Sequence, residues 1–275
     1  MTPITHLPAG TFYGQIRGRR ELDDLTLVES AYLPGLQIPT HVHARAFFYL
    51  VLEGVCTETC DGTVRTVEEL TLVFHPAGSS HSDRWHGGIG RCFSFEVPLA
   101  RLELAADNPP LPDHSVELCR GDAIWLATQL YREFRRAGDV SRLAIDGLLL
   151  EILAAVTPDR SRKIALTPPK WLTQSHELIH DRYTERLLLE EIAGAVGVHA
   201  MHLCRVFRKQ FGCSVGQYIR TLRLERASRE LVSSRKTVVE IAIDSGYSDQ
   251  SHFTHEFRSH TGMTPVEFRR HLRPR

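Results

Sequence analysis

The sequence is poor in cysteine and has no long apolar run. Its 275 residues contain six Cys, and no two of them form a CxxC pair. That density is too low for a disulfide scaffold, so we expect reduced thiols and a cytoplasmic protein. No apolar run approaches the roughly 18–20 residues that a membrane helix needs. The first ten residues, MTPITHLPAG, also lack the basic start and apolar stretch of a secretory signal, so we expect no membrane partner.

Sequence motifs of common enzymes are missing as well. The chain has no Gly-rich phosphate loop, no Ser–His–Asp arrangement and no zinc-protease HExxH motif. We therefore assign no catalytic residue.

The length and composition indicate a folded protein with two domains of opposite charge. Hydrophobic residues make up 42% of the chain and charged residues 24%, which excludes global disorder. Residues 1–160 hold 14 Lys and Arg against 21 Asp and Glu, whereas residues 161–275 hold 19 against 12. The resulting net charges of −7 and +7 indicate an acidic module joined to a basic one, and the basic one favours a polyanion. Chance surface composition is the alternative, so the motifs must decide.

Short strands separated by turns characterise residues 10–98. Apolar β-branched and aromatic runs such as Leu25–Val28 and Phe47–Leu52 alternate with turn pairs such as Asp61–Gly62. This spacing predicts a small barrel or sandwich. Apolar residues at helical spacing then predict two helices, at residues 118–134 and 140–156, which can form a hairpin.

The C-terminal half contains an internal repeat. The offset between the copies is 49 residues up to a Gly in the turn and 50 residues after it, so one residue is inserted inside the second turn. The recurring residues are Glu191, Ile192, Ala193, Gly197, Phe207, Arg208, Gly212 and Tyr218, matched by Glu240, Ile241, Ala242, Gly246, Phe257, Arg258, Gly262 and Phe268.

Each copy predicts two short helices around a Gly-containing turn. In the first copy a helix at 187–196 precedes a helix at 199–210. In the second, a helix at 238–245 precedes a helix that Ser248 caps and that ends near His260. A Gly turn between two short helices is the helix-turn-helix arrangement.

The second helix of each copy has a polar face that can read DNA. Leu203, Val206 and Phe207 in the first, and Phe253 and Phe257 in the second, form the apolar side. Polar side chains at i, i+3, i+4 and i+7 then point outward, where a helix in the major groove reaches base edges. A solvated surface is the alternative, which a matched pair of helices in a basic half disfavours. The predicted DNA-binding residues are Met201, Cys204, Arg205, Arg208, Gln250, Ser251, Thr254, His255 and Arg258.

Residues 215–232, between the two copies, predict a linker helix. A helix of this length spans about 27 Å, which with its turns could hold the two recognition helices about one DNA turn of ~34 Å apart. Arg220, Arg223, Arg226 and Arg229 on this helix could contact phosphates or simply solvate it.

Residues from about 170 to 272 resemble the DNA-binding domain of the AraC/XylS family of bacterial transcription regulators. The matching stretches are LLLEEIAGAVGVHAMHLCRVFRKQFGCSVGQYIRTLRLERA and VVEIAIDSGYSDQSHFTHEFRSHTGMTPVEFRRHLR. The resemblance implies binding to double-stranded promoter DNA, with RNA polymerase as a further partner. It places at base-facing positions Met201, Cys204, Arg205, Gln250, Ser251, Thr254 and His255. Two residues depart from the family pattern: His199 replaces the usual Ser cap, and Cys204 is a small side chain at a contact position.

The predicted barrel resembles the two cupin motifs. The matching positions are His41, His43, Gly54, Pro76, Gly78 and His81. Phe47 stands where the first motif has Glu, Trp85 where the second has Asn, and Leu70 where the second opens with Gly. His41 and His43 would share one side of a strand, and with His81 they could hold Zn²⁺ or Fe²⁺. Because the usual carboxylate ligand is absent, we assign no metal or other cofactor.

An organic effector among these side chains, or simple packing, is favoured over a metal. A barrel of this size can enclose one small ligand. The predicted effector-binding residues are His41, His43, Phe47, Tyr49, His81 and Trp85.

Two domains are therefore expected. The first, residues 1–157, is an all-β cupin-like barrel followed by a helical hairpin, and it senses the effector and dimerises. Residues 158–169 form a linker, and residues 170–275 form an all-α domain with two helix-turn-helix units on a linker helix. The predicted function is a homodimeric transcription regulator that responds to an unknown small molecule and is not an enzyme. Two alternatives stay open: a metal-dependent cupin enzyme carrying a DNA-binding module, and a regulator without a small-molecule ligand.

Overall fold

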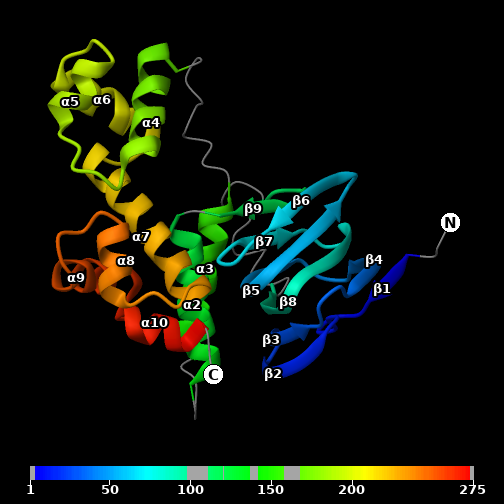
Figure 1. The fold of residues 1–275 in the computed structure, drawn as a ribbon. Helices are drawn as coiled ribbons and strands as arrows, with labels where there is room; N and C mark the ends of the chain where they lie inside the picture. Colours follow the sequence, from blue (N-terminus) through cyan, green and yellow to red (C-terminus); the bar gives the residue numbers. More distant parts are fainter. Residues whose placement is uncertain (1–3, 98–110, 120, 137–141, 158–167, 273–275) are drawn as a thin grey trace. The chain divides into compact units, whose positions relative to one another are not determined.

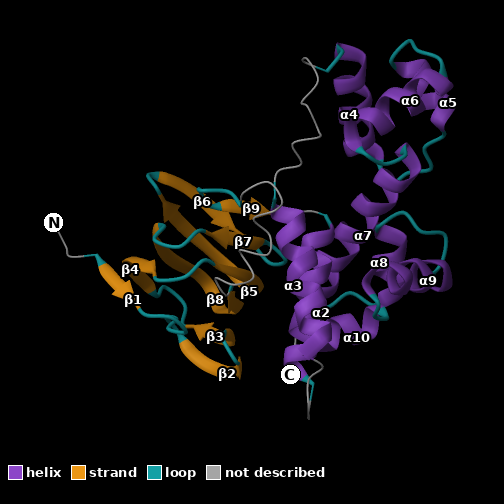
Figure 2. Ribbon diagram, turned by 180° about the vertical axis from the view of Figure 1, so that it is seen from behind, coloured by secondary structure: helices purple, strands orange, loops and turns teal. Residues whose placement is uncertain are grey.

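The computed structural model describes residues 4–97, 111–119, 121–136, 142–157 and 168–272. The chain divides into two compact units, residues 1–159 with 270–275 and residues 160–269. Of the described residues, the first unit holds the strands and two helices, and the second is built from helices (Figures 1 and 2). Most of the predicted linker, residues 158–167, lies outside the described residues. No helix in the described ranges is long and apolar enough to span a bilayer.

The strands of the first unit form one curved sheet, with nine strands in its described part (Figure 1). They are β1 (Thr5–Leu7), β2 (Gln15–Leu22), β3 (Leu25–Tyr32), β4 (Gln37–His43), β5 (Phe47–Cys60), β6 (Thr63–Val67), β7 (Leu72–His75), β8 (Ser80–Glu96) and β9 (Val116–Leu118). The order is β1-β4-β8-β5-β7-β9, with β3 also on β8, β2 on β3 and β6 on β5. The predicted all-β barrel is confirmed as a half-barrel.

The long strands β5 and β8 bend this sheet. They pair antiparallel over most of their length, with register shifts between Val51 and Val55. Within that stretch Gly54 has a φ of 87°, and a Cβ there would lie 3.1 Å from the Gly90 Cα. Glycine therefore permits the bulge at which the strands change direction.

Because side chains alternate along a strand, every second side chain of β8 points into the half-barrel. His81, Asp83 and Trp85 are spaced by two residues and line the same internal cavity. The indole ring of Trp85 stacks on Tyr32 at a centroid distance of 4.5 Å. A Cβ on Gly90 would lie 2.0 Å from that indole ring, so a glycine at this position makes room for Trp85.

Two packed helices follow the sheet, α2 (Asp122–Arg135) and α3 (Arg142–Val156). The first begins at Asp122 and not at the predicted Leu118. Residues Val116–Leu118 instead pair antiparallel with β7 as strand β9, so the backbone hydrogen bonds of Leu118 belong to the sheet.

A buried polar network fastens α2 to β3 and β8. The hydroxyl of Tyr131 donates to Glu29 Oε2 at 3.1 Å, and Arg91 Nη2 donates to Glu29 Oε1 at 2.6 Å. The Tyr131 ring also packs on Phe93, with centroids 5.2 Å apart. The helix is thus held by both apolar contact and a charge-assisted hydrogen bond.

The second unit contains the predicted repeat. Its helices are α4 (Lys170–Arg182), α5 (Leu189–Ala195), α6 (Ala200–Phe211), α7 (Val215–Ser233), α8 (Val238–Asp244), α9 (Gln250–Thr261) and α10 (Pro265–Leu272), the last of which extends past the unit boundary. α5 and α8 are offset by 49 residues and α6 and α9 by 50, which confirms the inserted residue in the second turn. The C-cap glycines Gly212 and Gly262 both adopt the left-handed conformation, with φ of 75° and 73°.

The prediction that Ser248 caps the second recognition helix is wrong. The helix α9 begins at Gln250, and the cap is Asp249, whose Oδ1 accepts the backbone N–H of His252 at 2.8 Å. Ser248 lies one residue too early and instead donates its hydroxyl to Asp249 Oδ2 at 3.1 Å. A carboxylate at an N-cap has the further advantage of the positive helix end.

We expect Asp249→Ala to destabilise the start of α9 by about 1 kcal/mol, because the amide of His252 loses its acceptor. Hydrogen exchange of the amides in the first turn of α9 should accelerate about fivefold, which is the rate equivalent of that energy. The matched control is Ser248→Ala, which removes a neighbouring hydroxyl but keeps the cap. If Ser248→Ala has the larger effect, the cap assignment fails.

Candidate DNA interface and effector cavity

The helices α6 and α9 expose matching faces. The order of exposed, half-buried and buried residues over 201–210 repeats at every position over 251–260. Leu203 and Phe207 on α6, and Phe253 and Phe257 on α9, are fully buried, while Val206 is half-buried. The opposite faces carry all nine predicted DNA-binding residues. Met201, Arg205, Arg208, Gln250, Ser251, His255 and Arg258 are exposed, and Cys204 and Thr254 are half-buried.

The first recognition helix is capped by a histidine. The Nδ1 atom of His199 accepts the backbone N–H of Met201 at 3.3 Å, so an imidazole does the work of the usual Ser hydroxyl. One turn later, Arg205 Nη2 donates to Nδ1 of the exposed His202 at 3.2 Å. This contact holds the Arg205 guanidinium at the helix surface, and the sequence pattern did not reveal it.

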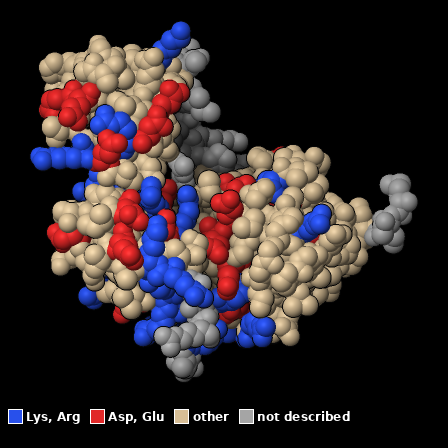
Figure 3. Space-filling model, in the orientation of Figure 1, with Lys and Arg blue, Asp and Glu red and all other residues tan. Residues whose placement is uncertain are grey.

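Arg220 and Arg223 of α7 make contacts inside the second unit. Arg223 donates to the backbone oxygens of Tyr183 and Glu185 at 2.6 and 2.7 Å. Arg220 forms an ion pair of 2.6 Å with Glu256 of α9. These two side chains connect α7 to its neighbours, so solvation alone does not describe them. On the helical unit, the face drawn in Figure 3 carries Lys and Arg side chains beside Asp and Glu.

The half-barrel contains a small cavity of about 40 Å³ that is partly open to solvent. All six predicted effector-binding residues lie on its wall, and the sequence analysis missed the other eight. The wall consists of Phe12, Tyr13, Tyr32, Ile38, His41, His43, Phe47, Tyr49, Cys56, His81, Asp83, Trp85, Cys92 and Ser94. Phe12 and Tyr13 precede β2 and pack on His43 and His41 at centroid distances of 5.3 and 4.8 Å.

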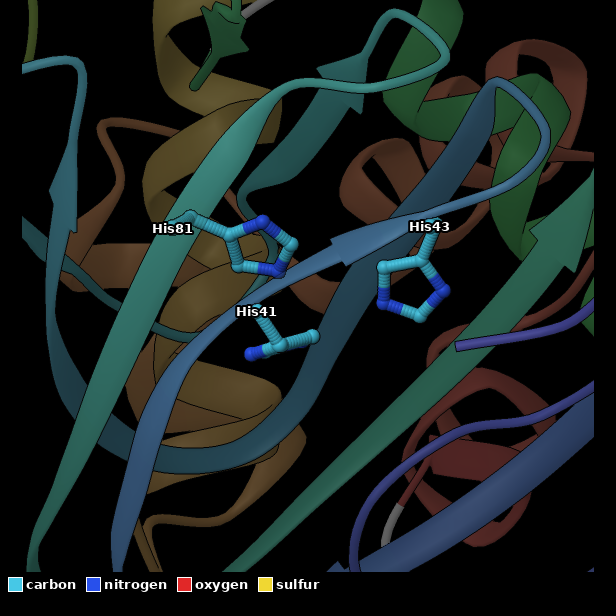
Figure 4. Close-up of side chains that lie close together, drawn as sticks. All are labelled: His41, His43 and His81. Carbon is cyan, nitrogen blue, oxygen red and sulfur yellow. The ribbon is translucent and has the colours of Figure 1, made fainter. Parts of the chain in front are cut away.

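Three buried histidines meet in this cavity (Figure 4). His41 and His43 come from β4, and His81 comes from β8, directly opposite His41. Burial lowers the pKa of His43 to about 3 and holds the pKa of His41 and His81 below the usual value, so all three rings are neutral. The Nδ1 of His41 lies 2.9 Å from the Pro39 oxygen.

These rings have the geometry to hold a divalent metal ion. One nitrogen of each lies within 4.8 Å of the others. Nδ1 of His43 and Nδ1 of His81 have no hydrogen-bond partner among the described residues. Three neutral imidazoles fit Zn²⁺ or Fe²⁺. At position 47, where the cupin pattern has a carboxylate, the ring of Phe47 packs on His43 with the two ring centroids 4.2 Å apart.

A buried carboxylate does exist nearby, at a position that the sequence analysis did not single out. Glu58 of β5 accepts hydrogen bonds from Tyr49 (3.0 Å) and His75 (2.8 Å), and it forms an ion pair with Arg65. Burial alone would raise the pKa of Glu58, but His75 and Arg65 outweigh it and hold the pKa low. Period-two counting along β5 from Cys56 would have put Glu58 on the inner face.

A second acid, Asp83, faces Glu58 across β5 and β8. Burial, followed by the charge of Glu58, raises the pKa of Asp83 to about 8. In the part of the chain that the structure describes, the Asp83 carboxyl has no hydrogen-bond or ion-pair partner. The indole N–H of Trp85 is also buried without an acceptor among those residues.

Comparison with known proteins identifies both units. The AraC-like ligand binding domain matches residues 26–153, and a helix-turn-helix domain matches residues 192–271. The probable transcription factor PqrA of Proteus vulgaris is 35% identical over 85 residues, which are 31% of this chain and 70% of that protein. The uncharacterized HTH-type transcriptional regulator YobQ of Bacillus subtilis is 27% identical over 241 residues, or 85% of this chain and 89% of that protein.

A solved structure of a transcriptional regulator with an AraC-type DNA-binding domain from Chromobacterium violaceum is 33% identical, with a TM-score of 0.36. It covers 38% of this chain and 96% of that one. The family assignment comes from the sequence matches. The chain belongs to the AraC family of transcription regulators, with a ligand-binding domain followed by a helix-turn-helix DNA-binding domain.

Proposed function

We propose that this regulator reads promoter DNA with α6 and α9 together. The observation that carries the proposal is the matching exposure of the two helices, which turns one polar face of each away from the core. The helix α7 has 19 residues and is therefore about 28 Å long. That length suits two neighbouring major grooves on one side of the duplex.

The side chains on these faces have the chemistry for base recognition. Arg205 and Arg208 can each donate two hydrogen bonds to guanine, and Gln250 can pair with adenine. The methyl groups of Met201 and Thr254 can pack on the methyl of thymine. Cys204 is half-buried and offers packing only, whereas Ser251, His255 and Arg258 add donors.

We expect Arg205→Ala to weaken binding to the specific site by roughly 1–3 kcal/mol, because a base contact is lost. Fluorescence anisotropy with specific and random duplexes should show the loss on the specific one only. The control Arg186→Ala removes an exposed positive charge outside both recognition helices and should leave the ratio of the two affinities unchanged. An equal loss on both duplexes after Arg205→Ala would mean a phosphate contact.

The first unit is proposed to form a homodimer through α3. Leu143, Gly147, Leu150 and Ala154 are spaced by four, three and four residues, which is the heptad pattern of a coiled-coil seam. Leu143 is 82% exposed and Leu150 is 45% exposed. Two such stripes in a symmetric pair would cover this apolar surface.

The double variant Leu143→Glu/Leu150→Glu should convert the dimer to a monomer, because four carboxylates would meet at the seam. Sedimentation equilibrium measures the change in mass. Leu33→Glu is the matched control, since Leu33 is 69% exposed, lies between β3 and β4 and is not in the stripe. The proposal fails if the double variant keeps the mass of a dimer.

The remaining parts of the proposal concern partners and chemistry. A small-molecule effector binds in the cavity of the half-barrel, and the DNA-bound dimer works with RNA polymerase in the cytoplasm. The regulator carries out no reaction of its own in this proposal, which the names of PqrA and YobQ as transcription regulators support. A regulator without a small-molecule ligand would leave the orphan polar atoms of the cavity unexplained.

A metal-dependent enzyme is the second candidate, which the three converging imidazoles favour. It requires about one equivalent of Zn²⁺ or Fe²⁺ per chain after purification without chelators, lost in His43→Gln. Elemental analysis of both proteins decides the matter. We expect a substoichiometric amount that is equal in the two, because Phe47 packs on His43 where the cupin pattern has a carboxylate, and the nearby carboxylate of Glu58 is engaged with Arg65 and His75.

A further inference from the structure

The cavity wall holds one acidic side chain that forms no ion pair with the described residues. Asp83 lies between His81 and Trp85 on the inner face of β8 and is half-buried. The described residues offer its carboxyl neither a hydrogen bond nor an ion pair. Because Asp83 is half-buried, solvent reaches part of its carboxyl, and a bound cation would take the place of that solvent.

The neighbouring positive charges fill this role only in part, because burial and the charge of Glu58 outweigh the attraction of Arg65 for Asp83. Arg65 and His75 are both engaged with Glu58, which stands opposite Asp83 and adds a like charge. His41, His43 and His81 are neutral, because burial lowers the pKa of each. Burial and Glu58 raise the pKa of Asp83 to about 8, so its carboxyl is mostly protonated near pH 7 and gives up that proton when it pairs with a cation. The titratable and charged groups around Asp83 are Tyr32 on β3, His41 and His43 on β4, Tyr49, Cys56 and Glu58 on β5, Arg65 on β6, and His81 and Cys92 on β8.

The rest of the wall has the chemistry that cations prefer. Six aromatic side chains line the cavity beside Asp83: Phe12, Tyr13, Tyr32, Phe47, Tyr49 and Trp85. The face of an aromatic ring attracts a cation, and this attraction grows when the pair is shielded from water. Nδ1 of His43 and Nδ1 of His81 are buried without partners and, in neutral rings, can accept N–H groups. An N–H-rich cation would satisfy these acceptors and the carboxylate together.

The cavity size limits what can enter. A volume of about 40 Å³ holds about three water-sized groups at ~10–15 Å³ each. Methylammonium or guanidinium fits this volume, whereas a sugar ring would extend through the open side of the cavity. The cavity therefore suits a head group, and the rest of a larger effector would extend toward solvent.

The geometry points to an effector with a cationic head group, an ammonium or guanidinium, which binds in the aromatic cavity with Asp83 as its counter-ion. This inference rests on the proposed effector-binding function of the first unit. It assigns a chemical class to the effector and a role to Asp83.

Guanidinium and urea form the sharpest pair of probes, because they share shape and size but differ in charge. Full-length protein in EDTA is titrated with each by calorimetry at millimolar concentration and constant ionic strength. Guanidinium should bind saturably, and urea should not. Asp83→Asn should weaken guanidinium at least tenfold. Asp24→Asn, which removes an exposed carboxyl of the same unit, should leave the affinity unchanged.

Thermal unfolding and DNA affinity of each variant show that it is folded. If Asp83→Asn fails that check, Asp83→Ser replaces it, and the same loss is expected. Equal binding of urea and guanidinium, or undiminished binding by a folded Asp83 variant, overturns the inference. A neutral or anionic compound that binds the cavity independently of Asp83 would also overturn it, and would leave the proposed sensing function intact. If the unaltered protein shows no preference for specific DNA, the proposed function fails instead.

Discussion

The DNA-binding unit depends on how α7 is fixed between the two helix-turn-helix motifs. Two recognition faces are useful only if their separation is constant, because successive grooves recur at a fixed interval. The first turn of α7 is closed by Ser214 and Gln217, which exchange backbone and side-chain hydrogen bonds. Arg223 donates hydrogen bonds to two backbone carbonyl groups of the segment between α4 and α5, and Arg220 forms an ion pair with Glu256 of α9. Polar contacts that cross between helices in this way resist sliding more than apolar packing alone does.

The half-barrel places polar side chains in a partly enclosed cavity, where each needs a hydrogen-bond partner or solvent. One acid, Glu58, is satisfied by three donors, and the other, Asp83, by none. Asp83 is half-buried, so solvent can act as its partner in the free protein. A cationic ligand would replace that solvent with a charge-assisted hydrogen bond, which is stronger than a neutral one. The same reasoning explains why the neutral histidines beside Asp83 repel no cation.

Sequence patterns predicted the helical unit well because its determinants are local. The offset of 49 and then 50 residues located the inserted turn residue, and the spacing of Phe253 and Phe257 gave the orientation of α9. The cap at Asp249 was missed because Ser248 and Asp249 are both good N-caps, and only the backbone geometry selects between them.

The cavity was harder to predict. His41, His43 and His81 carry a spacing signal, whereas Asp83 meets Glu58 only through the cross-strand register of β5 and β8. That register depends on a bulge near Gly54, which no local pattern fixes.

Ligand binding can control DNA binding only through a difference in affinity between two states of the protein. A shift from 1:99 to 99:1 requires about 5.5 kcal/mol, and a hydrogen bond to a charged group contributes about 1.5–3 kcal/mol. A cationic head group on Asp83 therefore provides only part of a full switch, and the remainder must come from contacts of the rest of the effector with Phe12, Tyr13 and the aromatic wall.

The strand β8 has the right connections to transmit such a change within the first unit. It carries Asp83 inside the cavity and, farther along, Arg91. The Arg91 guanidinium donates hydrogen bonds to Glu29 and to Tyr131 in the C-terminal half of α2. Because α3 packs on α2, the strand that carries Asp83 also supports the helix whose apolar stripe is proposed for dimerisation.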